Sequence, residues 1–220
     1  TDLVDIAVSY KPVFYMGGDY AKFHFIGEKK LIFVLADVTG HGVSAALIVN
    51  RIHIAIERLI REEIQPGELL KQLEEVISRD FGQMGIFLTA FCGLIDFSEK
   101  RLIYSNHGHP PQILLQSSDN SIVLMKSQTF LMGVGLEEDS VYHNDISFEE
   151  GDRIILFTDG ITEARNEKGE MFGQERLEKF SRHNAGLDVV QFNNKMLEEI
   201  ECFQKGQQED DIFLLTIQNK

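Results

Sequence analysis

The apolar residues of this chain fall into many short runs separated by turn residues, with a few longer amphipathic stretches among them. Short runs rich in Ile, Val and Phe, bounded by Gly, Pro, Asn or Asp, are typical of β-strands. The pattern predicts ten strands, at residues 4–10, 21–26, 31–36, 86–97, 101–105, 112–116, 122–125, 142–148, 153–157 and 212–218.

Four stretches have the spacing of amphipathic helices, at residues 43–63, 66–81, 174–183 and 187–203. In the first, Ala45, Ile48, Ile52, Ile56 and Leu59 recur every three or four residues and so lie on one face. Because strands and helices do not alternate one for one, a doubly wound parallel sheet is disfavoured. Antiparallel hairpins with helices packed outside them fit the pattern better.

The composition is that of a globular domain without nucleic-acid or membrane partners. A chain of 220 residues with 43% hydrophobic content can bury a large core, and we expect one domain over residues 1–220. The formal net charge of −14 argues against nucleic acid and anionic membranes, whose phosphates it would repel. No apolar stretch approaches the roughly 20 residues that span a bilayer. The chain starts in mid-pattern without Met, so we expect a domain excised from a longer protein with an N-terminal regulatory region.

The two cysteines bear on the redox environment of the protein. Cys92 and Cys202 lie in a strand-like and a helical run, with no CxxC pattern and no His at zinc spacing beside them. We expect both to be reduced core residues, which is consistent with a cytoplasmic protein.

A carboxylate ends the most apolar of the predicted strands. In LIFVLADVTGHG, residues 31–42, six apolar residues run directly into Asp37 and a glycine-containing turn. A charge beside a core is costly unless a partner offsets it. Taken alone, Asp37 is explained as a helix cap or a turn residue. The alternative is a metal ligand.

Other acids lie at strand boundaries in the same way. Asp159 follows the apolar run of RIILFTDG, Asp210 and Asp211 precede the last strand, and Asp19 follows two glycines. Each has an ordinary interpretation as a turn or loop residue. One hypothesis explains them together with Asp37: strand ends converge in a sheet, and hard oxygen ligands gathered there bind Mg²⁺ or Mn²⁺.

Five motifs, in register and covering essentially the whole chain, carry a family resemblance: MGGDY, ADVTGHGVSAAL, SNHGHPP, EEGDRIILFTDGITEARNEKGEMFG and EDDIFLL. They resemble the PPM family of metal-dependent protein Ser/Thr phosphatases, in its bacterial branch typified by the stage II sporulation and environmental-stress phosphatases. The resemblance implies an α+β fold, a four-layer α-β-β-α sandwich of two stacked antiparallel sheets flanked by helices.

The resemblance also implies a role for each acid. Asp37 would bridge two divalent cations, Mn²⁺ or Mg²⁺, and the backbone carbonyl of Val38 would bind one of them. Asp159 and Asp210 would bind the other cation, and Asp19 would hold the first directly or through water. Such a pair of cations activates a water that attacks phosphorus in line.

Three further assignments follow the family pattern less closely. Asp210 is preferred to Asp211 because the family's acidic position is the first of the pair. His41 or a metal-bound water is the candidate for protonating the leaving Ser or Thr, but His41 is equally explained as a residue packing at the helix entry. Lys11 is a candidate for gripping phosphate, and its ordinary interpretation as a surface lysine is the stronger one.

Two positions depart from the branch. Phe213 stands where Thr is usual, which we expect to change packing behind a metal ligand, and His107 stands where Ala is usual. Alternate residues of a strand share a face, so His107 and His109 suggest a zinc pair, but no third ligand is near them in sequence.

By resemblance, the substrate is a phosphoserine or phosphothreonine on a protein, with a STAS-type anti-sigma-factor antagonist in a partner-switching pathway expected. The alternative is a catalytically weak phosphatase-like binding module, although all the expected acids are present. A nucleotide phosphatase gains no support, because GHGVSAAL lacks the Lys and Ser/Thr of a P-loop. The helices at residues 43–81 are a hypothetical signal path from the regulatory region. The sequence leaves a homodimer open.

Overall fold

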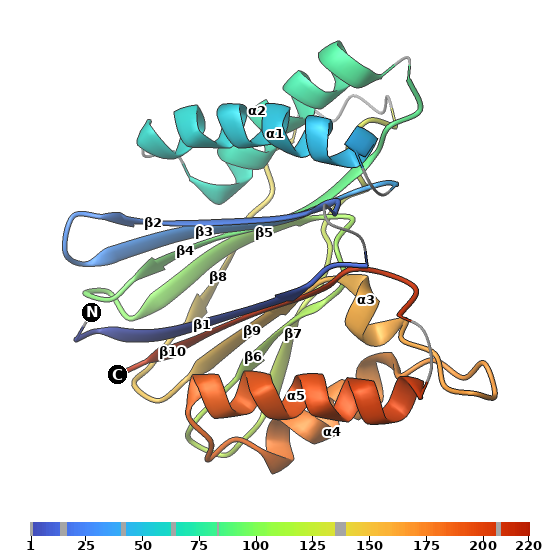
Figure 1. Ribbon diagram of the computed structural model, residues 1–220. Helices are drawn as coiled ribbons and strands as arrows, with labels where there is room; N and C mark the ends of the chain where they lie inside the picture. Colours follow the sequence, from blue (N-terminus) through green and yellow to red (C-terminus); the bar gives the residue numbers. More distant parts are fainter. Residues whose placement is uncertain are drawn as a thin grey trace. The chain divides into compact units, whose positions relative to one another are not determined.

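The computed structural model describes residues 2–13, 17–40, 43–62, 65–82, 84–134, 140–205 and 208–220. The chain forms two compact units, each assembled from separate stretches of sequence. Unit 1 comprises Thr1–Tyr15, Pro110–Met125 and Glu149–Lys220, and unit 2 comprises Met16–His109 and Lys126–Phe148. Each unit contains one five-stranded antiparallel sheet with helices on one face (Figure 1).

Unit 2 is built on a sheet with the strand order β2-β3-β4-β5-β8, and helices α1 and α2 cover one of its faces (Figure 1). The bounds are β2 Asp19–Ile26, β3 Lys30–Val38, α1 Val43–Arg61, α2 Pro66–Phe81, β4 Leu88–Asp96, β5 Arg101–His107 and β8 Asn144–Ser147.

The core of unit 2 fixes the strand that ends at Asp37. Alternate residues of β3, such as Ile32, Val34 and Ala36, pack with the apolar stripes of the two helices. Every side chain from Leu31 to Ala36 is fully buried, which confirms the predicted strand with two buried faces. Burial on both sides holds the end of β3 in place, and Asp37 with it.

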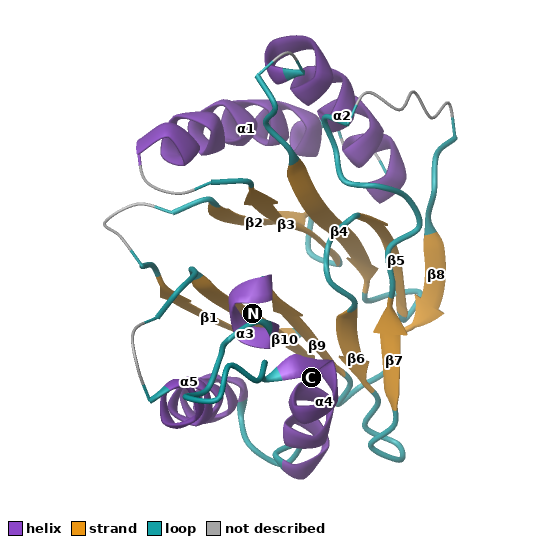
Figure 2. Ribbon diagram, turned by 90° about the vertical axis from the view of Figure 1, so that its right-hand side faces the viewer, coloured by secondary structure: helices purple, strands orange, loops and turns teal. Residues whose placement is uncertain are grey.

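Unit 1 is built on a sheet with the order β1-β10-β9-β6-β7, and α4 and α5 cover one of its faces (Figure 2). The bounds are β1 Val4–Lys11, β6 Gln112–Leu115, β7 Ile122–Met125, β9 Arg153–Phe157, α3 Asp159–Thr162, α4 Gly173–His183, α5 Val189–Gln204 and β10 Ile212–Asn219. Ile155, Phe157 and Leu214 of the sheet pack with Leu177, Phe192 and other residues of the helices.

The fold class predicted from the sequence, α+β with antiparallel sheets and helices outside them, is confirmed. Each predicted strand and helix is present within the described residues. The short helix α3 was not predicted. The last helix begins at Val189 rather than at residue 187, because the side chain of Asp188 accepts hydrogen bonds from the backbone N–H groups of Val190 and Gln191 and caps it there.

Two further observations bear on the sequence predictions. Cys92 is buried as expected, but Cys202 is exposed on α5, so its assignment to the core was wrong. Neither cysteine is in a disulfide. None of the helices in the described part of the chain is long and apolar enough to cross a membrane.

Candidate active site

Two carboxylates face each other at the end of the β2–β3 ladder in unit 2. Asp19, the first residue of β2, pairs with Asp37 near the end of β3. Directly opposed residues of an antiparallel pair project from the same face, with Cβ atoms about 4.5–5.5 Å apart. Like charges in such a pair repel each other, and a divalent cation between them would reverse the sign of that energy.

The glycine before Asp19 is pressed against the carbonyl group predicted as a ligand. A Cβ atom added to Gly18 would lie 2.5 Å from the carbonyl oxygen of Val38 and 3.4 Å from Oδ1 of Asp37. The Gly18 carbonyl in turn accepts a hydrogen bond from the Val38 N–H at 3.3 Å. Only glycine fits here, so the MGGD motif sets the position of Val38 as well as that of Asp19.

The next strand, β4, places a polar pair beside the two carboxylates, which the sequence did not reveal. Thr89 lies opposite Asp37 in the β3–β4 ladder. Its hydroxyl is 2.7 Å from Nδ1 of His109, and the backbone N–H of His109 donates to Oδ1 of Asn106 at 2.9 Å. His109 is buried and therefore fixes the orientation of the Thr89 hydroxyl beside the carboxylates.

A second acidic pair lies in unit 1, where β9 leads into α3. Asp159 is the first residue of α3 and lies close enough to Asp210 for their charges to interact. Burial, followed by the negative charges of Asp210 and Glu163, raises the pKa of the Asp159 carboxyl from 3.8 to about 6. A cation bound here would favour the ionised form, as it would at Asp19 and Asp37.

Glycine again allows the close approach of two segments. A Cβ atom on Gly160 would lie 1.9 Å from the carbonyl oxygen of Asp211, so only glycine lets the 210–211 segment lie against the start of α3. Thr158 and Phe213 reinforce this contact: each donates its backbone N–H to the other residue, Thr158 to the Phe213 carbonyl and Phe213 to the Thr158 hydroxyl. The ring of Phe213 lies 5.7 Å from the ring of Tyr10, and its effect on packing behind a metal ligand stays a prediction.

The neighbouring acids Asp210 and Asp211 have different surroundings. Asp211 is buried, and its carboxylate accepts hydrogen bonds from the Val13 N–H at 2.8 Å and from the Tyr10 hydroxyl at 3.5 Å. Asp210 is exposed and lines a hollow of about 100 Å³ together with Glu163. The exposed position of Asp210 is consistent with its prediction as the ligand. Asp211 instead holds the segment after β1 by hydrogen bonds, a difference between the two acids that the sequence did not reveal.

The predicted site residues thus fall into two groups. Asp19, Asp37 and Val38 lie together in unit 2, and Asp159 and Asp210 lie together in unit 1. Within the described residues, no three His, Cys, Asp or Glu side chains form a metal-binding group. Neither acidic pair alone supplies the six ligands that a hard divalent cation takes.

The remaining candidates can be placed individually. His41 lies outside the described residues. The ammonium group of Lys11 pairs with the carboxylate of Glu201 on α5, and both side chains are about half exposed, which favours the ordinary interpretation of Lys11 as a surface residue.

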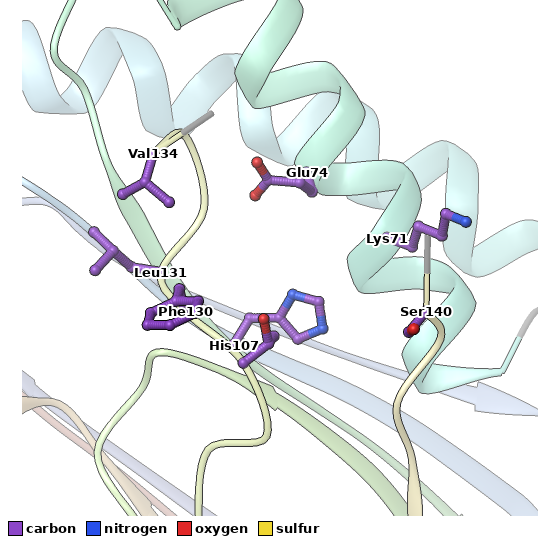
Figure 3. A pocket seen from close by; sticks show the side chains of 8 residues that line it. Lys71, Glu74, His107, Phe130, Leu131, Val134 and Ser140 are labelled. Atoms are coloured by element: carbon purple, nitrogen blue, oxygen red, sulfur yellow. The ribbon is translucent and has the colours of Figure 1, made fainter. Parts of the chain in front are cut away.

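His107 and His109 occupy separate surroundings. His107 points into a hollow beneath α2, where it faces Glu74 and Lys71 (Figure 3). His109 instead contacts Thr89. The hypothesis of a zinc pair therefore gains no support from their positions.

The comparison with known families decides the identity of the domain. The sequence model of the family described as stage II sporulation protein E (SpoIIE) matches residues 27–220. The chain belongs to the SpoIIE family. Over all 220 of its residues this SpoIIE-family chain is 28% identical to the phosphoserine phosphatase RsbU of Bacillus subtilis, and it covers 64% of RsbU. It spans 33–64% of the length of three curated relatives that it matches.

Solved structures of PP2C phosphatase domains share the fold of this SpoIIE-family chain. The SiaA-PP2C domain of Pseudomonas aeruginosa matches with a TM-score of 0.86 and 20% identity, over 97% of this chain and 85% of that one. The catalytic domain of the serine/threonine phosphatase PstP, in complex with two manganese ions, matches with a TM-score of 0.68 and 15% identity, over 99% and 98% of the two chains. The predicted branch is therefore confirmed by the SpoIIE family match, and the predicted fold is confirmed by these structures.

Proposed function

We propose that this domain is a metal-dependent protein phosphatase that hydrolyses phosphoserine or phosphothreonine on a regulatory protein. The observation that carries the proposal is the pairing of Asp19 with Asp37 at the end of a fully buried strand. Opposed carboxylates at the end of a strand pair supply the oxygen ligands that a hard divalent cation prefers, and such a cation would offset their mutual repulsion. The family match supplies the reaction class, since RsbU is named a phosphoserine phosphatase.

The residues fit hard divalent cations. Carboxylates and a backbone carbonyl are the oxygen ligands that Mg²⁺ and Mn²⁺ prefer. Asp37, Asp19 and the Val38 carbonyl would hold one cation, and Asp159 and Asp210 would hold a second. When bound, two such cations supply a nucleophilic water at neutral pH and neutralise charge on the phosphoryl oxygens.

The chain itself prepares these ligands. Gly18 fixes the Val38 carbonyl by close contact, and the Thr89–His109 pair lies beside Asp37 in the same row. Asp159, whose pKa is raised to about 6, holds a proton in acid and must release it before it can act as a ligand. His41 remains our candidate for protonating the leaving hydroxyl group.

The proposal also covers the substrate protein and its signalling pathway. By similarity to RsbU, we propose a phosphorylated STAS-type anti-sigma-factor antagonist as the partner, in the cytoplasm, with dephosphorylation switching its binding partner. The net charge of −14 is consistent with a protein substrate rather than nucleic acid. A regulatory region preceding this domain stays a prediction.

A metal titration of phosphopeptide hydrolysis tests the function. We expect Mn²⁺- or Mg²⁺-dependent release of phosphate from a phosphoserine peptide, reduced by about 100-fold or more in Asp37→Asn and in Asp159→Asn. Asp145→Asn is the matched control, because the side chain of Asp145 is exposed and pairs with Arg101 within the same sheet. Undiminished turnover in Asp37→Asn would overturn the proposal. Peptide binding without turnover in the wild type would indicate the binding module instead.

A further inference from the structure

A cavity of about 510 Å³ lies in unit 1, away from the acidic pair. It opens at the start of β9, whereas Asp159 follows the end of the same strand. A strand rises about 3.3 Å per residue, so the five residues of β9 separate the two places by well over a hydrogen-bond distance. The cavity is lined by Ser117, Arg153, Arg182, His183, Gly186 and Gln218, among others.

Arg153, the first residue of β9, is a buried cation with unused donors. Its side chain is only 2% exposed, and its guanidinium stacks over the ring of Phe192 at 5.1 Å. Nη2 donates to the carbonyl of Leu187 and, at 2.7 Å, to Oε1 of Gln218. Within the described residues, Nε and Nη1 have no hydrogen-bond partner. Buried charged donors left unsatisfied are costly, and such groups call for an explanation.

The acids around Arg153 are engaged elsewhere. Asp188 acts on Arg153 through its charge, but its Oδ1 accepts the N–H groups at the start of α5. Asp152 accepts from the Ser117 N–H at 2.8 Å and from the Glu149 N–H at 2.9 Å. None of these contacts occupies Nε or Nη1 of Arg153.

The rim of the cavity adds a further positive charge. Arg182, at the end of α4, is about half exposed and reaches Glu178 one helical turn earlier at 3.5 Å. His183 lies beside it. Two guanidinium groups suit a dianion, and their planar donors match the oxygens of phosphate. The cavity volume of about 510 Å³ lies within the range of small-molecule binding sites. The cavity is therefore larger than a single ion requires.

We propose that this cavity is a binding site for a phosphate-bearing small molecule, held by Arg153 and Arg182 and separate from the metal centre. The phosphate group is the shared chemistry of two sources, free inorganic phosphate and a phosphate monoester such as a nucleoside monophosphate. Nε and Nη1 are buried in this structure, so binding would turn the guanidinium toward the open volume, where these donors would meet the phosphate oxygens. The remaining volume would hold the rest of a monoester.

Gly186 offers a sharp test, because a Cβ atom there meets nothing within 4 Å. Gly186→Glu places a carboxylate in the cavity, and Gly186→Gln is the neutral control of nearly the same shape. Arg153→Met removes the charge and keeps an apolar chain over Phe192. Each variant is made in the full chain that also carries Asp37→Asn, so that phosphate bound at the metal centre does not contribute, and folding is checked by thermal unfolding.

Binding of inorganic phosphate and of adenosine monophosphate is measured by titration calorimetry. We expect saturable binding of at least one probe, unchanged within about twofold in Gly186→Gln and weakened by about tenfold or more in Gly186→Glu and Arg153→Met. A preference for adenosine monophosphate identifies a monoester, and a preference for inorganic phosphate identifies the free ion. Equal affinities of Gly186→Glu and Gly186→Gln, or no binding of either probe, would refute the site. Neither result depends on phosphatase activity.

Discussion

Asp19 lies directly opposite Asp37 across the β2–β3 ladder. The register that brings them together is fixed by the core, because a slip of one residue would exchange the side chains that β3 presents to the helices with those on its opposite buried face. The fold therefore brings two negative charges together. They lie at the end of a strand pair, where both carboxylates are partly exposed. Stability and function oppose each other at this position.

Removing one charge should therefore stabilise the metal-free protein. We expect Asp19→Asn to raise the free energy of unfolding by about 0.5–1 kcal/mol in the presence of a chelator, because a like-charge cross-strand pair is lost. The same variant should gain less stability than the wild type from added Mn²⁺. Urea unfolding with and without the metal measures both effects. Asp145→Asn serves as the control, and equal stability of wild type and Asp19→Asn in chelator would count against the repulsion.

The raised pKa of Asp159 predicts the pH dependence of metal-free stability. The carboxyl holds its proton to about pH 6 in the folded state but only to 3.8 when unperturbed. Its contribution to stability is therefore complete below the lower value and is lost as pH rises through about 6. After allowance for partial exposure to solvent, we expect a loss of about 1–2 kcal/mol.

Urea unfolding in chelator between pH 4 and pH 7.5 measures this loss. Asp159→Asn should remove this part of the pH dependence and should be more stable than the wild type at the upper end, since no charge forms beside Asp210. Parallel profiles for the two proteins would show that Asp159 titrates normally.

Because Gly18 lies in close contact with the Val38 carbonyl, we expect a larger side chain at position 18 to destabilise the protein. Gly18→Ala should lower the free energy of unfolding by about 1–3 kcal/mol, because its Cβ atom would lie 2.5 Å from a backbone oxygen that cannot move freely. Metal affinity should fall as well, since Val38 is a proposed ligand. Gly186→Ala is the matched control, with open space around the added atom. If both substitutions had the same small effect in thermal unfolding, the proposed role of Gly18 would be wrong.

The sequence predicted the fold well wherever the hydrophobic pattern was long or strongly apolar. The buried run that ends at Asp37 and the stripes of α1 and α5 left little choice of element. Helix α3 was missed because four residues are too short to show a period of 3.6. The start of α5 was misplaced because Leu187 continues the apolar pattern, whereas the cap at Asp188 decides where the helix begins.

The candidate site was predictable only in part, for a different reason. Acids at strand ends could be read from the sequence, because each follows or precedes an apolar run. The pairing of Asp37 with Thr89, and of Thr89 with His109, depends on strand register and on a loop that returns to the sheet. The distinct roles of Asp210 and Asp211 depend on where β1 ends, which no local pattern encodes.

Substitutions of Asp210 and Asp211 test which of the two is the metal ligand and which stabilises the fold. Asp210→Asn should abolish metal-dependent turnover while leaving metal-free stability within about 0.5 kcal/mol of the wild type, because Asp210 is exposed. Asp211→Asn should instead lower the free energy of unfolding by about 1–3 kcal/mol, because one oxygen that accepts from Val13 or Tyr10 becomes an amide donor in a buried position.

Chemical denaturation in chelator and phosphopeptide turnover at saturating Mn²⁺ together distinguish the two variants. Asp211→Asn should keep turnover under conditions in which it is folded, since its carboxylate faces the end of β1 rather than the hollow beside Glu163. The reverse result, with stability lost in Asp210→Asn and turnover lost in a folded Asp211→Asn, would exchange the two roles and move the proposed ligand by one residue.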